Sequence, residues 1–140
     1  TNPSFDWEST LPDDEIERLF LDGIALQPDD QMLRSVYADW CEQNAMLEKA
    51  AYLRGREIPW IELAAVTDVR WRAIVSTELT PLHAGHYPDR WSRLTPIESE
   101  LYVRQCPACE KRVRYCMTDA DRSNAQLLGE IVHRDRGLHR

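Results

Sequence analysis

Three of the four cysteines lie close together in the sequence, at positions 106, 109 and 116. Cys106 and Cys109 enclose a Pro–Ala pair, and such a C-P-x-C turn brings two thiolates near enough to bind one metal ion. The hairpin predicted around this turn is expected to bring Cys116 back beside it. A closed zinc site needs a fourth ligand, and His133 lies on a short predicted strand that should flank the hairpin. We therefore expect a structural zinc site formed by Cys106, Cys109, Cys116 and His133.

Other interpretations of the cysteine cluster stay open. His83 and His86 are competing donors for the fourth position. The three thiols could also be reduced and metal-free, around a small core. A redox pair of Cys106 and Cys109 is disfavoured because no thioredoxin-like βαβ pattern precedes it.

The sequence carries no catalytic constellation of a known type. It lacks the H-E-x-x-H motif of zinc proteases and the H-x-E that zinc deaminases place before P-C-x-x-C. It also lacks G-x-S-x-G, and its five glycines form no phosphate-binding loop. We therefore expect a non-enzymatic protein, with an enzyme of unrecognised type as an alternative.

Residues 12–56 are predicted to form three helices. The first covers residues 12–26, the second begins at residue 29 or 30 and ends at a break formed by residues 43 and 44, and the third covers residues 45–56. Pro28 ends the first helix, and Asp29 or Asp30 caps the second. Apolar residues at helical spacing are expected to face inward; they are Ile16, Leu19, Phe20 and Ile24, then Leu33, Val36, Tyr37 and Trp40, then Leu47, Ala50, Ala51 and Leu53. Replacing Trp40 by Ala is expected to cost about 3–5 kcal/mol of stability.

The remaining residues change from helical to β-rich patterns. Residues 61–66 and 69–74 are predicted to be helical, and residues 80–96 to form loops. A hairpin is predicted over 101–106 and 112–117, then a helix over 119–130 with Ala125 and Leu128 inward, then a strand over 131–135. The fold class is therefore α+β. We expect a helical bundle over residues 1–58, a linker helix with proline-rich loops over 59–100 and a ββαβ unit over 101–140, packed as one compact body.

The segment L-R-S-V-Y-A-D-W-C-E-Q-N, residues 33–44, resembles the bacterial repeat-companion domain family. The resemblance rests on an R-x-x-Y-A-D-W motif and on a following L-R pair; the matching residues are Arg34, Tyr37, Ala38, Asp39, Trp40, Glu42, Leu53 and Arg54. Long members of the family are also similar over a C-x-x-C-x-x-x-V-x-Y-C segment, matched here by residues 106–116. The resemblance implies a bacterial protein and an architecture, without an established activity.

Charge is distributed unevenly along the chain. Residues 1–60 carry 13 acidic and 5 basic side chains, and residues 61–140 carry 11 acidic and 12 basic ones. The acidic first half would repel phosphates, so nucleic acid is an improbable partner. We expect an adaptor that binds another protein through this acidic half, with Trp7 and Trp60 as exposed contact residues.

Three further expectations complete the interpretation. Arg34, Asp39 and Arg54 are expected to form an ion-pair network that orients the second and third helices. Nucleic-acid binding through the Cys turn is an alternative function, because it is surrounded by the basic residues Arg104, Lys111, Arg112 and Arg114. The sequence shows no membrane-spanning run and no signal peptide, so we expect a cytoplasmic protein that does not bind membranes.

Overall fold

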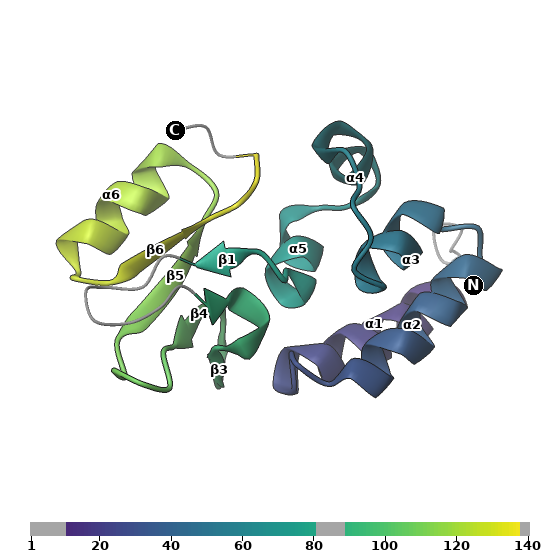
Figure 1. Ribbon diagram of the computed structural model, residues 1–140, viewed down its shortest axis with the longest axis horizontal. Coiled ribbons are helices and arrows are strands. Elements are labelled where there is room, and N and C mark those ends of the chain that lie inside the picture. The colour runs from purple at the N-terminus through teal and green to yellow at the C-terminus, as the bar shows by residue number, and fades with distance from the viewer. Residues whose placement is uncertain (1–10, 81–88, 138–140) are drawn as a thin grey trace, which may run out of the picture.

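A computed structural model describes residues 11–80 and 89–137 of the 140-residue chain. Helices come first along the chain and most of the strands come last (Figure 1), which confirms the α+β fold class. Seen in the plane of Figure 1, the helical part and the sheet lie side by side, with α5 (Val69–Val75) between them.

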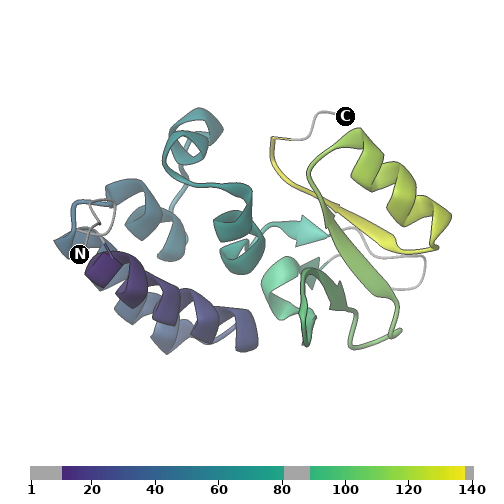
Figure 2. The same cartoon turned by 180° about the vertical axis from the view of Figure 1, so that it is seen from behind.

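The helical part begins with α1 (Leu11–Leu26), α2 (Gln31–Gln43) and α3 (Leu47–Leu53), as the apolar spacing predicts. Asp30 caps α2, because its side chain accepts a hydrogen bond of 3.0 Å from the Leu33 amide. α1 and α2 run alongside each other (Figure 2), and Gly23 permits this close approach. A Cβ atom at Gly23 would lie 2.8 Å from the Leu33 side chain.

The core of the helical part is built mainly from aliphatic and aromatic side chains. Ile24 and Tyr37 are fully buried in it, and the Tyr37 ring stacks on Phe20 at a centroid distance of 5.0 Å. α4 (Trp60–Val66) adds Leu63, and α5 adds Trp71. The Trp71 indole N–H donates to the Tyr37 hydroxyl at 2.8 Å, so a hydrogen bond joins α2 to α5 inside this core.

A four-stranded sheet forms the other part of the molecule. Its strand order is β3 (Thr95–Ile97), β4 (Glu100–Gln105), β5 (Arg112–Cys116) and β6 (Ile131–Arg134). The first three strands are antiparallel, and β6 pairs parallel to β5 after a crossover through α6 (Asp119–Leu127). A short pair, β1 (Leu79–Thr80) with β2 (Asp89–Arg90), and the 3-10 helix η2 (Trp91–Arg93) connect α5 to the sheet.

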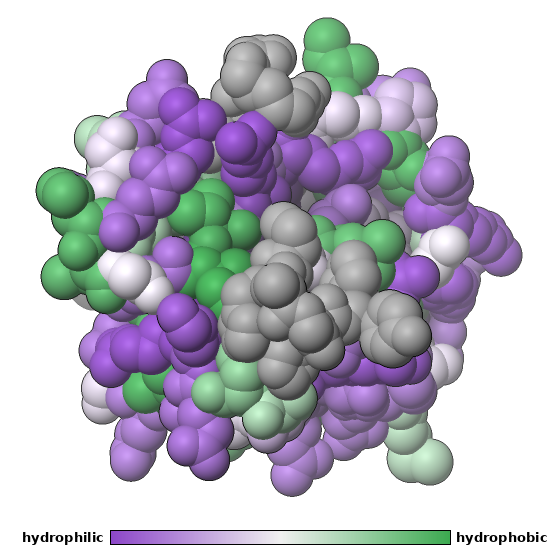
Figure 3. Space-filling model, turned by 60° about the vertical axis from the view of Figure 1, so that its left-hand side comes forward, coloured by the Kyte–Doolittle hydropathy of each residue, from purple (hydrophilic) through white to green (hydrophobic). Residues whose placement is uncertain are grey.

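Each face of the sheet has its own packing. Val113 and Tyr115 on β5 pack with Trp91 and Leu94, whereas Cys116 packs with Ala125 of α6. Because side chains alternate along a strand, residues 113 and 115 face one side and residue 116 the other. Hydrophilic side chains cover much of the surface at the sheet end of the molecule, with separate apolar patches among them (Figure 3).

Five aliphatic side chains that were expected to face inward are exposed instead, and Ile16 is one of them at 41%. Leu19 is 72% exposed and Val36 is 50% exposed, although both were expected to face inward. Leu47 and Leu128 are also exposed. On α1 and α2 the buried arc is centred on neighbouring residues, including Leu21 and Ala38, so Leu19 and Val36 point outward instead.

No helix in the described ranges combines the length and the apolar character needed to cross a lipid bilayer.

Candidate functional site

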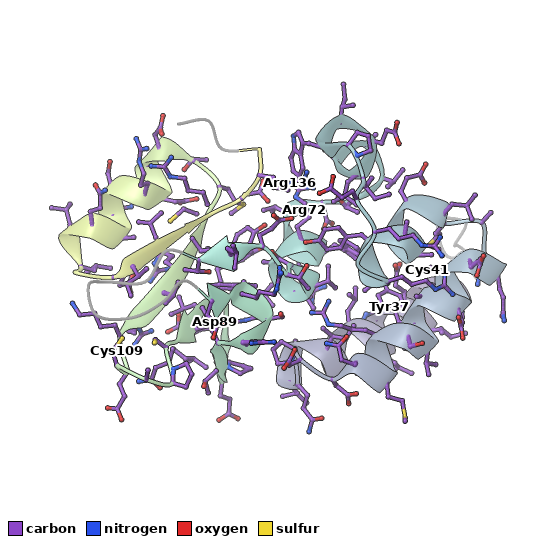
Figure 4. All side chains as sticks on the ribbon, viewed as in Figure 1. Tyr37, Cys41, Arg72, Asp89, Cys109 and Arg136 are labelled. Carbon is purple, nitrogen blue, oxygen red and sulfur yellow. The ribbon has the colours of Figure 1, made fainter. Side chains whose placement is uncertain are left out.

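The Cys106–Cys109 turn joins β4 to β5 at one end of the sheet (Figure 4). The Cys106 amide donates to Lys111 O at 2.9 Å, and the Glu110 amide donates to Cys106 O at 2.8 Å. Glu110 has a positive φ of 63°, which turns the chain sharply after the second cysteine. The two cysteines are therefore held close together on a tight, hydrogen-bonded turn.

The electrostatics of Cys106 differ from those of the other buried thiols. Burial raises the pKa of Cys106, but hydrogen bonds from the Cys109 and Ala108 amides outweigh it and leave the pKa below its usual value. Burial raises the pKa of Cys41 to about 12 and that of Cys116 to about 11. Cys106 is therefore the one of these three cysteines whose surroundings favour the thiolate that metals and electrophiles require.

The hairpin does not bring Cys116 to this turn, which corrects the expected ligand set. Residue 105 pairs with residue 112, so Cys116 lies at the far end of β5. Cys116 is five positions along the chain from Lys111, which corresponds to about 17 Å at about 3.3 Å per residue. His133 is also excluded from the turn, because it pairs with Tyr115 and faces the side of the sheet opposite to Cys116.

No third ligand completes a metal site with Cys106 and Cys109 in the part of the chain that the structure describes. Within it, no group of three or more His, Cys, Asp or Glu side chains is placed to hold a metal ion. The competing donors His83 and His86 lie outside the described residues. Cys106 and Cys109 thus provide two thiols of the four ligands that a structural zinc site needs.

His133 belongs to a buried polar cluster. Its ring stacks on Trp91 at a centroid distance of 4.9 Å, and its Nδ1 lies 2.5 Å from the Thr80 hydroxyl. Burial and, to a smaller extent, the charge of Arg104 lower the pKa of His133 to about 4, against a smaller opposing effect of Asp135. The ring is only 1% exposed, so a substrate cannot reach this hydroxyl–imidazole pair. We interpret the pair as part of the core.

Asp135 connects the same region to α5. The Tyr115 hydroxyl donates to its carboxylate at 2.5 Å, and Arg72 binds both of its oxygens at 3.0 and 3.3 Å. A bidentate pair of this kind fixes geometry as well as charge. The end of β6 is therefore anchored to α5.

The expected network of Arg34, Asp39 and Arg54 is formed only in part. Arg54 binds Asp39 at 2.5 Å, and this ion pair is largely exposed to solvent. Arg34 does not join it. Its buried guanidinium instead donates to the carbonyls of Pro28 and Val75, both at 2.8 Å. Arg34 thus connects the α1–α2 turn at Pro28 to the C-terminal end of α5 through backbone carbonyls, which sequence spacing does not reveal.

Of the two tryptophans that were expected at the surface, Trp7 and Trp60, the structure describes the second. Trp7 lies outside the described residues. Trp60 is half-buried, and its ring lies 4.6 Å from the Arg72 guanidinium and 5.9 Å from that of Arg136. Arg72 and Arg136 lie close together in Figure 4. Intramolecular contacts therefore occupy much of the Trp60 ring.

The basic side chains around the Cys turn are largely occupied by other groups. Arg104 is buried and donates to backbone carbonyls, with its guanidinium 4.5 Å from the Trp91 ring. Arg112 and Arg114 form ion pairs with Glu130, and Arg112 also pairs with Glu100. This geometry leaves few free cations for a nucleic-acid backbone.

The outer surface of α1 and α2 carries a feature that the apolar spacing did not reveal. Large apolar side chains are exposed on both helices, and we call them the α1–α2 apolar face; they are Ile16 (41% exposed), Leu19 (72%), Met32 (78%) and Val36 (50%). Phe20 and Trp40, half-buried with ring centroids 5.9 Å apart, join the two helices beside this face. Residues three or four apart on a helix share a surface, which places Ile16 near Phe20 and Val36 near Trp40.

Acidic residues border the α1–α2 apolar face. Glu15 and Asp22 lie four and three residues from Leu19 on α1, and Asp39 lies three residues from Val36 on α2. All three are exposed. An apolar centre with a charged rim is the usual anatomy of a protein-binding surface.

Comparison of the chain with models of protein families, with curated proteins and with solved structures finds no match.

Proposed function

We propose that this chain is a non-enzymatic protein-interaction module that binds its partner through the α1–α2 apolar face. The observation that carries the proposal is the exposure of Ile16, Leu19, Met32 and Val36 on one pair of helices. Each such side chain exposes apolar area whose burial is worth about 25 cal/mol per Å². A partner that covers the face recovers this free energy.

The charge of the helical half indicates the chemistry of the partner. Residues 1–60 carry a net charge of −8. Charge complementarity favours a partner segment with apolar side chains flanked by Lys or Arg, such as a basic amphipathic helix.

The compartment and the family are further parts of the proposal. Four free cysteines are typical of a reducing compartment, so we propose a cytoplasmic setting. The R-x-x-Y-A-D-W motif supports a proposal that the chain is a bacterial repeat-companion domain protein.

A peptide selection tests the interaction. Two displayed libraries of amphipathic helical peptides would be offered to the protein, one with Lys and Arg beside the apolar positions and one with Asp and Glu. We expect the basic library alone to yield binders. The double variant Leu19→Ser/Val36→Ser should weaken their binding at least tenfold. Leu127→Ser/Leu128→Ser is the matched control, because it removes two exposed leucines from the sheet part.

The kinetics of the selected peptide give a second readout. Exposed acidic residues accelerate association more than they slow dissociation. Raising the salt concentration should therefore lower the association rate while the dissociation rate changes little. Two results would contradict the proposal: an equal loss of binding in both double variants, or an association rate that does not change with the salt concentration.

The Cys106–Cys109 turn supports a second proposal, a zinc site that contains these two thiolates. Hydrogen bonds from the Cys109 and Ala108 amides lower the pKa of Cys106, which favours the thiolate form that zinc binds. Elemental analysis of protein purified without chelator should find about one zinc per chain. Cys109→Ser should abolish it, whereas Cys116→Ser and His133→Ala should retain it. Alanine variants of His83 and His86 test the competing donors. A folded chain without zinc would refute this proposal.

A further inference from the structure

A cavity of about 600 Å³ lies where the helical part meets the segment after α5. Its wall combines the start of α2, the end of α3, Thr77 and the β2–η2 segment. Four arginines line it, Arg34, Arg54, Arg90 and Arg93, against a single carboxylate, that of Asp29. Such a concentration of guanidinium groups is unexpected in a chain with a net charge of −7.

Arg34 is the buried member of this set. It is only 2% exposed, its Nε and Nη1 donate to backbone carbonyls, and its Nη2 has no hydrogen-bond partner among the described residues. Within those residues no carboxylate lies within ion-pair distance of it. A buried charge that lacks a counter-charge is costly, because carbonyl dipoles replace only part of its hydration.

A second buried arginine close to Arg34 adds to the excess of positive charge around it. Burial lowers the pKa of Arg34, whereas Asp29 and Tyr52 raise it. Arg104, also buried, binds the carbonyls of Ala73 and Ile74 while Arg34 binds that of Val75. Two guanidiniums thus share the C-terminal end of one short helix, and, besides burial, the charge of Arg34 contributes to lowering the pKa of Arg104.

The remaining arginines differ in how far they are neutralised. Arg54 forms ion pairs with Asp39 at 2.5 Å and with Glu42 at 3.1 Å. Arg93 lies 3.9 Å from Asp89, at the limit of an ion pair. Arg90 donates to the Thr77 carbonyl at 2.8 Å and has no carboxylate partner in the described ranges. Arg34 and Arg90 are therefore the cations that an incoming anion would neutralise most effectively.

We propose that this cavity binds a small organic anion that carries a phosphate group. Guanidinium groups present paired N–H donors whose spacing matches the oxygens of a phosphate. The cavity volume lies in the range of small-molecule sites, and the hydroxyl-bearing residues Ser35, Tyr52 and Ser92 also line it.

This cavity and the α1–α2 apolar face lie on different sides of α2. Arg34 and Val36 are two residues apart on α2 and so project from opposite sides of this helix. The cavity is therefore separate from the α1–α2 apolar face.

Calorimetric titration tests this site with defined probes at constant ionic strength. The probes are inorganic phosphate, ribose 5-phosphate, adenosine monophosphate, citrate and ribose. We expect a phosphate monoester to bind more tightly than inorganic phosphate, and ribose not to bind. Arg90→Gln changes an exposed side chain, so the variant should fold. It should weaken monoester binding about tenfold, which corresponds to one lost charge-assisted hydrogen bond.

Arg70→Gln is the matched control, because Arg70 is exposed on α5 and outside the cavity. The dissociation constant of the Arg70→Gln variant for the phosphate monoester should equal that of the wild type. Binding that Arg70→Gln and Arg90→Gln weaken equally would show diffuse charge attraction and overturn the proposal. The absence of monoester binding at millimolar concentration, or tighter binding of citrate, would overturn it as well.

Discussion

The two parts of the molecule depart from simple burial rules to different degrees, although Arg34 is buried in the helical part and Leu127 and Leu128 are exposed in the sheet part. The helical part exposes large apolar side chains, among them Leu19 and Val36, on its outer surface. The sheet part instead buries polar ones, including Arg104, His133 and Asp135. Buried polar groups that are hydrogen-bonded position a core, whereas exposed apolar side chains in a group indicate a binding surface. The contrast supports our proposal that the helices, rather than the sheet, bind the partner.

The largest expected effect is in the core of the sheet part. Trp91 is fully buried, stacks with His133 and donates its indole N–H to Ala73 O. Trp91→Ala should lower the free energy of unfolding by about 3–5 kcal/mol, because it empties a large aromatic site and removes one of the two side-chain donors to Ala73 O. Denaturant unfolding measures the loss. A value below 1 kcal/mol would contradict the assigned core.

The next effect is a loss of stability in acid from His133. Its pKa is about 4 in the folded chain, against 6.5 for an unperturbed histidine. The unfolded chain therefore binds the proton more readily, and stability is lost as the pH falls from about 6.5 to about 4. The loss is about 3 kcal/mol. Arg104 and Asp135 are the charged groups that influence this ring.

Comparison with His133→Gln isolates this effect from the titration of carboxylates. The stability advantage of the wild type over the variant should shrink by about 3 kcal/mol between pH 7 and pH 4. If the difference between the two proteins does not vary with pH, His133 is not held neutral by burial.

A smaller effect is expected in the helical part. Trp40 is half-buried against Phe20 and Tyr37. Trp40→Ala should therefore cost about 2 kcal/mol, less than the 3–5 kcal/mol predicted from its spacing alone. Measuring Trp40→Ala beside Trp91→Ala sharpens the comparison of the two parts. Equal losses of unfolding free energy in the two variants would show that the contact between α1 and α2 is as well packed as the core of the sheet part.

The smallest effect on stability is expected on the α1–α2 apolar face. Leu19→Ser and Val36→Ser should each change the free energy of unfolding by no more than about 0.5 kcal/mol, because both side chains are largely exposed. Urea unfolding of each variant checks this. A loss above 2 kcal/mol would mean that these side chains stabilise the fold rather than a complex.

Periodicity and capping predict the elements well, because both depend on local chemistry. The helices α1 and α2, the β4–β5 hairpin and the α6–β6 succession follow from apolar spacing, from Asp30 and from the Cys turn. The edge strand β3 was missed, because Pro96 at its centre is typical of a loop. Leu19 and Val36 were misplaced because apolar residues surround more than half of each helix, so spacing alone cannot choose the buried arc.

The candidate sites depend on register and on long-range contacts, which the sequence does not display. The spacing of Cys109 and Cys116 is compatible with a hairpin, but the strand register places Cys116 at the opposite end. Arg34 appears in a motif, yet its partners are carbonyls of Pro28 and Val75, the latter 41 residues away. The arginine-lined cavity draws on several separate segments, so only the folded chain brings it together.

Hydrogen exchange with and without a selected basic peptide tests the central claim most directly. Bound peptide should slow amide exchange in α1 and α2, around residues 15–40, and leave α6 and the sheet unchanged. Leu19→Ser/Val36→Ser should abolish this protection, and Leu127→Ser/Leu128→Ser should retain it. Protection confined to α6 or to the sheet would contradict the assignment of recognition to the helical part.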